Sequence, residues 1–135
     1  VTEIGEGAFC DCTALQEIVI PNSVTKIGDD AFRDCKSLYE IDIPNSVTEI
    51  GNRAFYGCKS LEEIVIPNSV TEIGDDAFGY SMLLDEVIIP DSVTYIGPGA
   101  FKASTFLRRI VLPKSLAVDE TDIIDDVTCV VVRKD

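Results

Sequence analysis

The sequence predicts an α/β repeat solenoid, in which short parallel strands and short helical turns stack coil upon coil. Two observations lead to this prediction. A 23-residue unit, V-T-x-I-G-x-x-A-F-x-x-C-x-x-L-x-x-I-x-I-P-x-S, recurs five times over residues 1–115 without an insertion or deletion. A unit of this length cannot bury its own apolar side chains and has to stack on copies of itself. We therefore expect five coils over residues 1–115 and a degenerate C-terminal capping coil over residues 116–135.

The first two elements of each unit are an extended segment and a turn. V-T-x-I is rich in β-branched residues, which favour strands. G-x-x-A-F-x-x-C predicts a short helical or 3-10 turn, with Asp29 or Asp30 as its N-cap. The spacing of Phe32 and Cys35 then directs both side chains into the core.

The third element, I-x-I-P, predicts a short strand. Ile18 and Ile20 should point inward and Val19 outward, because side chains alternate along a strand. The proline that follows cannot donate a ladder hydrogen bond and ends the strand. Equivalent strands of successive coils are expected to lie parallel, about 4.8 Å apart.

The C-terminal segment departs from the unit. Leu116 occupies the valine column, but no glycine, Ala-Phe pair or proline follows at the expected spacing. Val130 and Val132 fit the inward strand positions if three residues are deleted. We expect this shortened coil to close the stack, with the charged residues 133–135 protecting its outer edge from further pairing.

The pattern as a whole resembles that of the BspA-like (Treponema pallidum-type) leucine-rich repeat family. The hallmark of that family, L-x-x-I-x-I-P-x-x-V-T-x-I-G-x-x-A-F-x-x-C, is matched over residues 1–115, except that Ser81 and Ser104 stand in the cysteine column. The resemblance implies a curved, right-handed solenoid with its parallel sheet on the concave face and short helical turns opposite. It also implies cell-surface or secreted proteins that mediate adhesion and protein contacts, and no catalytic activity.

Charge and composition speak against several functions. The chain carries 24 acidic and 11 basic residues, a formal net charge of −13, which disfavours nucleic-acid binding through phosphate neutralisation. It contains no histidine, which excludes Ser-His-Asp and Cys-His catalysis and His-ligated metals. No apolar run is long enough to cross a membrane. Adjacent carboxylates such as Asp29-Asp30 are explained by capping of a turn, so we expect no catalytic residues, cofactor or metal.

Three of the five cysteines, Cys12, Cys35 and Cys58, share one column and should stack facing the core. Neighbouring Cα atoms would then lie within the range of a disulfide bond. Parallel side-chain directions and burial favour reduced thiols that pack as small apolar groups. Disulfide bonds and a metal site are the alternatives, although a linear ladder lacks the tetrahedral arrangement that zinc prefers.

The columns that the fold leaves unconstrained form the candidate ligand-binding surface. Two of them run side by side along the outer face of the expected concave sheet. The first is mainly acidic and the second mainly apolar: Glu17, Glu40, Glu63, Glu86 and Arg109, then Val19, Asp42, Val65, Ile88 and Val111. Apolar side chains on an outer face often mark an interface, although strand propensity alone also favours β-branched residues there.

A second candidate surface lies at the turn between the cysteine and leucine columns. This turn is polar in the first three units and apolar in the next two. We call its apolar residues the aromatic patch: Tyr80, Met82, Leu83 and Phe106. Ile123 and Ile124 are expected to fold back over the aromatic patch, and the alternative is that it forms a second contact surface.

The first unit begins in full consensus at Val1, with no capping sequence before it. Its open strand edge and the apolar side chains of Phe9, Leu15 and Ile18 predict fraying of the first coil or self-association through this N-terminal edge.

Together these features favour a non-enzymatic protein-interaction or adhesion module, a fragment of a larger cell-surface or secreted repeat protein. Its expected partner is a protein ligand, either a host protein or a surface protein of the same cell. The alternatives are a structural spacer with no ligand of its own and an intracellular, cytoplasmic scaffold, which reduced thiols would suit. Neither nucleic-acid binding nor membrane insertion by this segment is expected.

Overall fold

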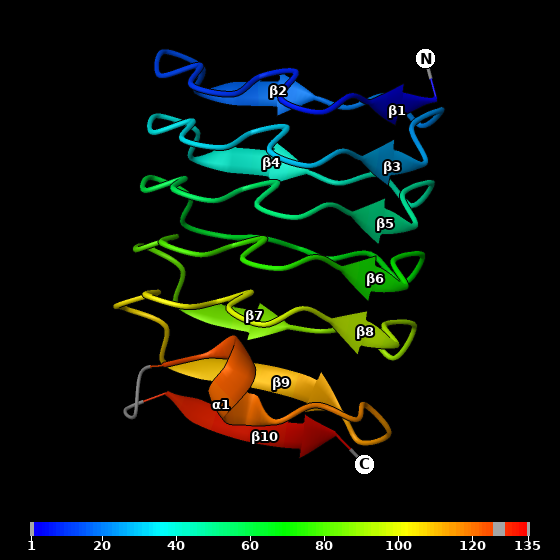
Figure 1. Ribbon diagram of the computed structural model, residues 1–135, viewed down its shortest axis with the longest axis vertical. Helices are drawn as coiled ribbons and strands as arrows, with labels where there is room; N and C mark the ends of the chain where they lie inside the picture. The colour runs from blue at the N-terminus through cyan, green and yellow to red at the C-terminus, as the bar shows by residue number, and fades with distance from the viewer. Residues whose placement is uncertain (1, 126–128, 135) are drawn as a thin grey trace.

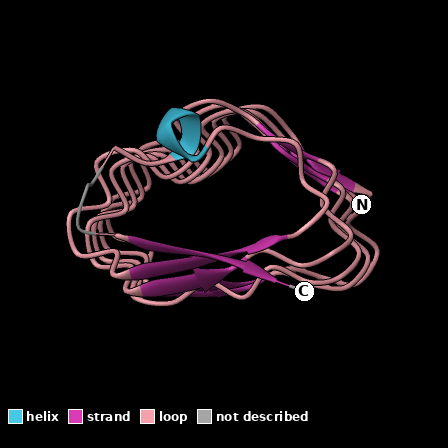
Figure 2. Cartoon of the chain, turned by 90° about the horizontal axis from the view of Figure 1, so that it is seen from below, coloured by secondary structure: helices cyan, strands magenta, loops and turns pink. Residues whose placement is uncertain are grey.

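The chain winds into a parallel β-solenoid of about six turns (Figure 1). The computed structural model describes residues 2–125 and 129–134. We number the coils one to six, over residues 2–23, 24–46, 47–69, 70–92, 93–115 and 116–134. Seen along the stack, longer strands form one wall of the ring and shorter strands a second, while turns and the helix α1 (Glu120–Ile123) close the rest (Figure 2).

The V-T-x-I segments form one continuous parallel sheet, as predicted for an extended stretch. Each isoleucine pairs in register with the isoleucine of the next coil, as Ile27 does with Ile50. The neighbouring threonines add a side-chain ladder, in which the Thr48 hydroxyl donates to the Thr25 carbonyl oxygen at 3.2 Å. The strands of this sheet, in spatial order, are β1 (Glu3–Ile4), β3 (Lys26–Ile27), β5 (Glu49–Ile50), β6 (Glu72–Ile73) and β8 (Tyr95–Ile96).

The I-x-I segments form the second wall, which we call the I-x-I face. The predicted alternation is confirmed, because Ile20 and Ile41 are buried and Val19 is exposed. Pairing along this face is interrupted: coil three contributes only an isolated bridge between Asp42 and Val65, and the ladder resumes at coil four. The strands are β2 (Glu17–Val19), β4 (Glu40–Asp42), β7 (Glu86–Ile88), β9 (Arg109–Pro113) and β10 (Val130–Lys134).

The G-x-x-A-F-x-x-C segments are successive turns in the structure, and the helical turn predicted there does not form. Asp30 and Asp34 have φ values of 57° and 58°, in the left-handed region that a right-handed helix cannot use. The backbone therefore bonds to the next coil, with the N–H of Phe32 donating to the Ala54 carbonyl at 2.7 Å. The Asp29 carboxylate likewise accepts from the N–H of Asn52 in the next coil rather than capping its own turn.

The core is built around a column of phenylalanine rings. Phe32, Phe55 and Phe78 are fully buried. Each successive pair of rings is stacked with a centroid separation of 5.2 Å and nearly parallel planes. The predicted inward direction of this column is therefore confirmed.

The C-terminal coil continues the core with different side chains. Ile123 and Ile124 take the places of the Ala-Phe pair and are buried, and the N–H of Phe101 donates to the Ile123 carbonyl at 2.8 Å. Helix α1 leads into this position, and its N-cap Asp119 accepts from the N–H of Thr121 at 3.0 Å. The expectation that Ile123 and Ile124 cover the aromatic patch is wrong, because they extend the core column instead.

The register expected for the last strand is also wrong by one residue. Val131 pairs with the inward Ile110 and packs against the core, whereas Val130 is exposed. Coil six is thus two residues shorter than the repeat at this point, not three. Between Ile124 and the strand no residue of the sequence matches its consensus column, so the sequence pattern could not fix the register of the strand.

Arg133 does not project from the outer edge as a solvated charge. Its guanidinium donates to the carbonyl oxygens of Pro113, Leu116 and Val118 at 2.8–3.1 Å, and to the Glu120 carboxylate at 3.1 Å. Arg133 therefore links the last strand to residues 113–120, where coil five ends and coil six begins. The side chain of Lys134 and the whole of Asp135, expected to protect the same edge, lie outside the described residues.

The first coil is less completely buried than those that follow it. Phe9, Leu15 and Ile18 are half-buried, whereas their counterparts in coil two are buried. Self-association through this edge stays a prediction, and sedimentation of the 135-residue chain over a range of concentrations would test it.

The cysteine column changes character in coils four and five. The buried thiols of Cys35 and Cys58 donate to the carbonyl oxygens of Phe9 and Phe32, at 3.0 and 3.2 Å. Ser81 and Ser104 are buried at the equivalent positions, but neither hydroxyl has a hydrogen-bond partner among the described residues. An unsatisfied buried hydroxyl destabilises the fold.

Ser81→Cys is accordingly expected to raise the free energy of unfolding by about 1 kcal/mol, because the larger thiol fills the slot and removes the unpaired hydroxyl. Urea denaturation under reducing conditions measures the change. Ser81→Ala is the matched control and should gain less, since it removes the hydroxyl without filling the slot. A variant less stable than the parent would show that the hydroxyl is satisfied by water.

Candidate functional site

The glutamate column (Glu17, Glu40, Glu63 and Glu86) lies exposed along the outer side of the I-x-I face. Strand register places Glu17 directly opposite Glu40 of the next coil. Like charges in this relation repel, by about 1 kcal/mol per pair at contact distances in water. The column ends on a cation, since Arg109 pairs with Glu86 and its Nη1 lies 3.6 Å from the Glu86 Oε2.

The valine column (Val19, Asp42, Val65, Ile88 and Val111) runs beside it. Val19, Val65 and Ile88 are 90%, 65% and 52% exposed, so three apolar side chains face solvent on a strongly acidic surface. Val111 is only 7% exposed, and its proposed place on an accessible surface is wrong. It lies between Ile88 of β7 and Val132 of β10, its register partners on either side.

A third column belongs to this surface and was not recognised from the sequence. It precedes the glutamate column by one residue and consists of Gln16, Tyr39, Glu62, Asp85 and Arg108. Arg108 Nη2 donates to the Asp85 Oδ2 at 2.8 Å, and this hydrogen bond lowers the pKa of the Asp85 carboxyl. One feature of the sequence could have revealed this column: two adjacent acidic residues stand at 62–63 and again at 85–86, and two adjacent arginines stand at the equivalent positions 108–109.

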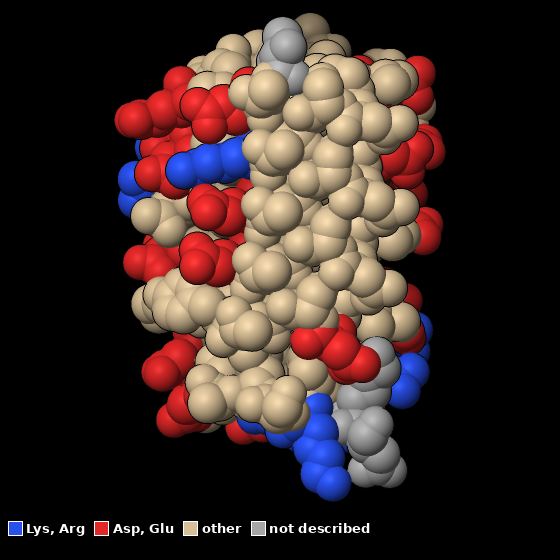
Figure 3. All heavy atoms as spheres, turned by 90° about the vertical axis from the view of Figure 1, so that its right-hand side faces the viewer, with Lys and Arg blue, Asp and Glu red and all other residues tan. Residues whose placement is uncertain are grey.

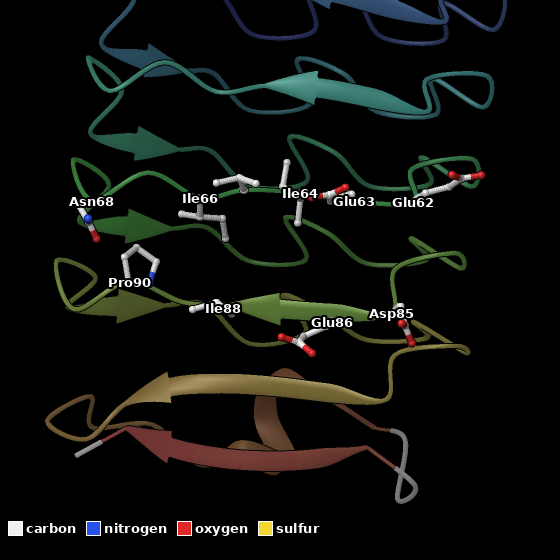
Figure 4. A pocket seen from close by; sticks show the side chains of 10 residues that line it. Glu62, Glu63, Ile64, Ile66, Asn68, Asp85, Glu86, Ile88 and Pro90 are labelled. Atoms are coloured by element: carbon white, nitrogen blue, oxygen red, sulfur yellow. The ribbon is translucent and has the colours of Figure 1, made fainter.

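Grooves lie between successive coils on this face. The groove between coil three and coil four has a volume of about 510 Å³ (Figure 4). Its lining is mixed, with five apolar residues and four carboxylates among its members: Ile64, Val65, Ile66, Ile88 and Pro90, then Glu62, Glu63, Asp85 and Glu86. Smaller grooves between coils one and two and between coils two and three are lined by the same columns.

The side of the stack formed by the right-hand turns of Figure 1 has a different surface. Figure 3 shows an uncharged band along most of its height, with carboxylates gathered on both sides of it. Exposed threonines contribute to the neighbouring sheet, and their hydroxyls already donate to the backbone of the preceding coil. The uncharged band distinguishes this side from the I-x-I face, where the glutamate column is exposed.

The aromatic patch is exposed on another part of the ring. Tyr80, Leu83 and Phe106 are exposed, and Met82 is half-buried. Tyr80 also packs edge-on against Tyr56, with ring centroids 5.2 Å apart. The patch spans only coils four and five, so it forms a small, separate surface.

Comparison with known proteins places the fold in a family. The sequence profile described as "BspA type Leucine rich repeat region" matches residues 2–126 in six copies. The chain belongs to the BspA-type leucine-rich repeat family. A search of the curated proteins found no match.

Solved structures resemble this BspA-type repeat protein closely. The leucine-rich repeat protein of T. pallidum superposes with a TM-score of 0.86 at 33% identity, over 98% of this chain and 63% of that one. One from Bacteroides ovatus has a TM-score of 0.77 at 34% identity, over 86% of this chain and 36% of that one. A leucine rich cell surface protein of Faecalibacterium prausnitzii has a TM-score of 0.82 at 28% identity, over 90% and 32%. This chain therefore spans less than two thirds of each of these relatives.

The cysteine column of the BspA-type repeats is reduced in the structure. Cys10, Cys12, Cys35 and Cys58 form no disulfide bond. Burial raises the pKa of the Cys35 thiol to about 11 and that of Cys58 further, so both thiols stay protonated near neutral pH. Within residues 2–125 and 129–134, no cluster of acidic or cysteine side chains has the arrangement of a metal site, and no helix is long and apolar enough to cross a bilayer.

Proposed function

We propose that this BspA-type repeat protein is a non-enzymatic protein-interaction module that acts at the cell surface or after secretion, with the I-x-I face of coils one to four as its contact surface. One observation carries the proposal: the apolar side chains of Val19, Val65 and Ile88 face solvent beside the carboxylates of the glutamate column. Exposed apolar groups within a charged surface are typical of protein interfaces.

The family relatives support the same assignment. The F. prausnitzii protein is described as a cell surface protein. PcpA, described as a pneumococcal vaccine antigen, shares the fold at 21% identity with a TM-score of 0.75. The proposal includes the right-handed curvature that the family resemblance implies. With the I-x-I strands on the concave side, this face would be a concave contact surface.

The rival functions are a spacer without a ligand and an intracellular scaffold. If the protein is only a spacer, substitutions on the I-x-I face that preserve solubility would not change the binding of any partner. The reduced, protonated thiols of Cys35 and Cys58 suit a cytoplasmic scaffold, but buried thiols also survive outside cells because oxidants cannot reach them.

The double variant Glu40→Gln/Glu63→Gln tests the contact surface. We expect it to be as stable as the parent or slightly more stable, because two like charges in register are removed. We also expect it to lose affinity for basic or mixed-charge protein partners, since those carboxylates would no longer attract cations. Thermal denaturation and pull-down of surface and secreted proteins with the parent and the variant measure the two effects.

Glu49→Gln/Glu72→Gln is the matched control, because these two glutamates are register partners on the V-T-x-I sheet and the change in charge is the same. Partners retained by this control and lost by Glu40→Gln/Glu63→Gln identify the I-x-I face. Equal retention by both variants would remove the glutamate column from the contact surface. A clear fall in stability would instead assign the glutamates a structural role.

A further inference from the structure

The ladder of the I-x-I face is broken between coils three and four. No backbone hydrogen bond joins residues 62–66 to residues 85–89 in the described structure. At other junctions the N–H of one coil donates to the carbonyl of the preceding coil, as Tyr39 does to Gln16 and Arg108 to Asp85. The equivalent bond from the Asp85 N–H to the Glu62 carbonyl is not formed in the described structure. The two coils stay joined elsewhere, through the Ile50–Ile73 pairing of β5 with β6 and the stacked phenylalanines. The opening is therefore local to this wall.

Charge accounts for where the break falls. Coils one, two and three place one like-charged pair across each junction, because Gln16 and Tyr39 are neutral. Coil three places Glu62 and Glu63 in the same columns as Asp85 and Glu86, so two like-charged pairs would face each other. At the next junction Arg108 and Arg109 face the same two carboxylates, and the strands pair over the full length of β7. Pairing is reduced to one bridge between coils two and three, is absent where two like-charged pairs face each other, and is regained where arginines face the carboxylates.

The break leaves a groove with three kinds of binding group. Its backbone N–H and C=O groups lack ladder partners, like those of an exposed strand edge. Val65 and Ile88 supply exposed apolar surface. Asp85 and Glu86 each form an exposed ion pair with an arginine of coil five, whereas Glu62 and Glu63 form no ion pair with a described cation. The carboxylates without an ion pair therefore lie on the coil-three side of the groove, where Figure 4 labels Glu62 and Glu63.

We propose that this groove binds an extended segment of a protein in which a lysine or arginine and an apolar residue stand two positions apart, on one face of the segment. An extended segment offers backbone groups to the open ladder, in the manner of peptides that pair with sheet edges. Residues two positions apart project from one face of an extended segment, so an apolar side chain can contact Val65 and Ile88 while a cation two positions away meets Glu63. Its cations relieve the repulsion around Glu62 and Glu63, which gives binding a gain beyond ordinary charge attraction. This inference rests on the proposed protein-binding function and assigns it a location and a class of partner.

The test uses the whole chain and a short capped peptide with the repeated pattern Lys-Thr-Val-Thr, whose lysines and valines project from one face. We expect it to bind, and to bind at least about tenfold more tightly than a peptide of the same composition with its lysines grouped together (about 1.4 kcal/mol). Amide exchange over residues 62–66 and 85–88 should slow on binding. Glu62→Gln/Glu63→Gln should weaken binding at least about tenfold, and Glu49→Gln/Glu72→Gln should leave it within about twofold.

Four results would overturn the inference. They are absence of binding, equal affinity for the two peptides, equal loss in both glutamine variants, and amide protection outside residues 62–66 and 85–88. Loss of peptide binding in Glu17→Gln/Glu40→Gln but not in Glu62→Gln/Glu63→Gln would move the site to another part of the face. That result overturns the groove while leaving the proposed function intact, because the function itself is tested by the pull-down of protein partners.

Discussion

Replacing Phe55 by alanine is expected to lower the free energy of unfolding by about 3–5 kcal/mol. The ring is fully buried and stacks on Phe32 and Phe78 at 5.2 Å on each side. Its removal leaves a cavity that neighbouring backbone cannot fill, because each coil is held to the next by regular backbone hydrogen bonds such as that from Phe55 N–H to the Ala77 carbonyl. Urea denaturation measures the loss.

The same substitution should also uncouple the two halves of the stack, since each coil contacts only its neighbours. Amide exchange in coils one and two should then quicken more than in coils four and five. Phe9→Ala is the control, because Phe9 is half-buried and stacks on one ring only. An unchanged unfolding midpoint for Phe55→Ala would contradict the central place of this column.

Gly74→Ala is expected to cost about 3 kcal/mol, at the upper end of the range for overpacking. An added Cβ would lie 2.6 Å from the backbone nitrogen of Asn52 and 2.7 Å from the carbonyl carbon of Gly51. Both atoms belong to the backbone of coil three, so relief requires the coils to separate. Thermal denaturation of the variant measures the effect.

Gly5→Ala is a matched control from the same column of the repeat. Nothing lies within 4 Å of a Cβ added at Gly5, because no described coil stacks on that side. Alanine there should be neutral or stabilise by up to about 1 kcal/mol, through the lower entropy of the unfolded chain. Equal destabilisation by the two variants would show that the glycine column serves backbone conformation and not the close approach of coils.

The parts of the fold that follow from the repeat could be predicted from the sequence. The inward positions of Ile20, Phe32 and Cys35 were predictable because a repeated apolar column can be buried only by stacking on itself. The turn conformation was not, because φ values near +57° at Asp30 and Asp34 arise from bonding to the next coil, whereas local propensity favours a helical cap. The strand register in coil six also escaped prediction, since no repeated residue marks it.

The candidate site was predictable in outline and not in detail. Glu40 and Val65 lie on the outer face because alternation along a strand requires it. The burial of Val111 depends on β10, whose register could not be predicted, and the opening at Glu62 and Glu63 depends on charges from two coils at once. A single repeat column predicts whether a side chain points inward or outward, whereas a groove is lined by residues of several columns and cannot be predicted from one of them.

Uniform spacing along the phenylalanine column has a consequence for how such a chain changes length. All four ring pairs from Phe9 to Phe101 lie 5.2 Å apart, so the upper surface of one coil fits the lower surface of any other. Duplication or deletion of a whole 23-residue unit would keep every type of core contact and needs no compensating substitution. Individual partners also join particular coils at the surface, as Asp30 does with Arg53 and Asp85 with Arg108. Gain or loss of a whole unit is therefore expected to change such surface ion pairs while the spacing of the phenylalanine column stays the same.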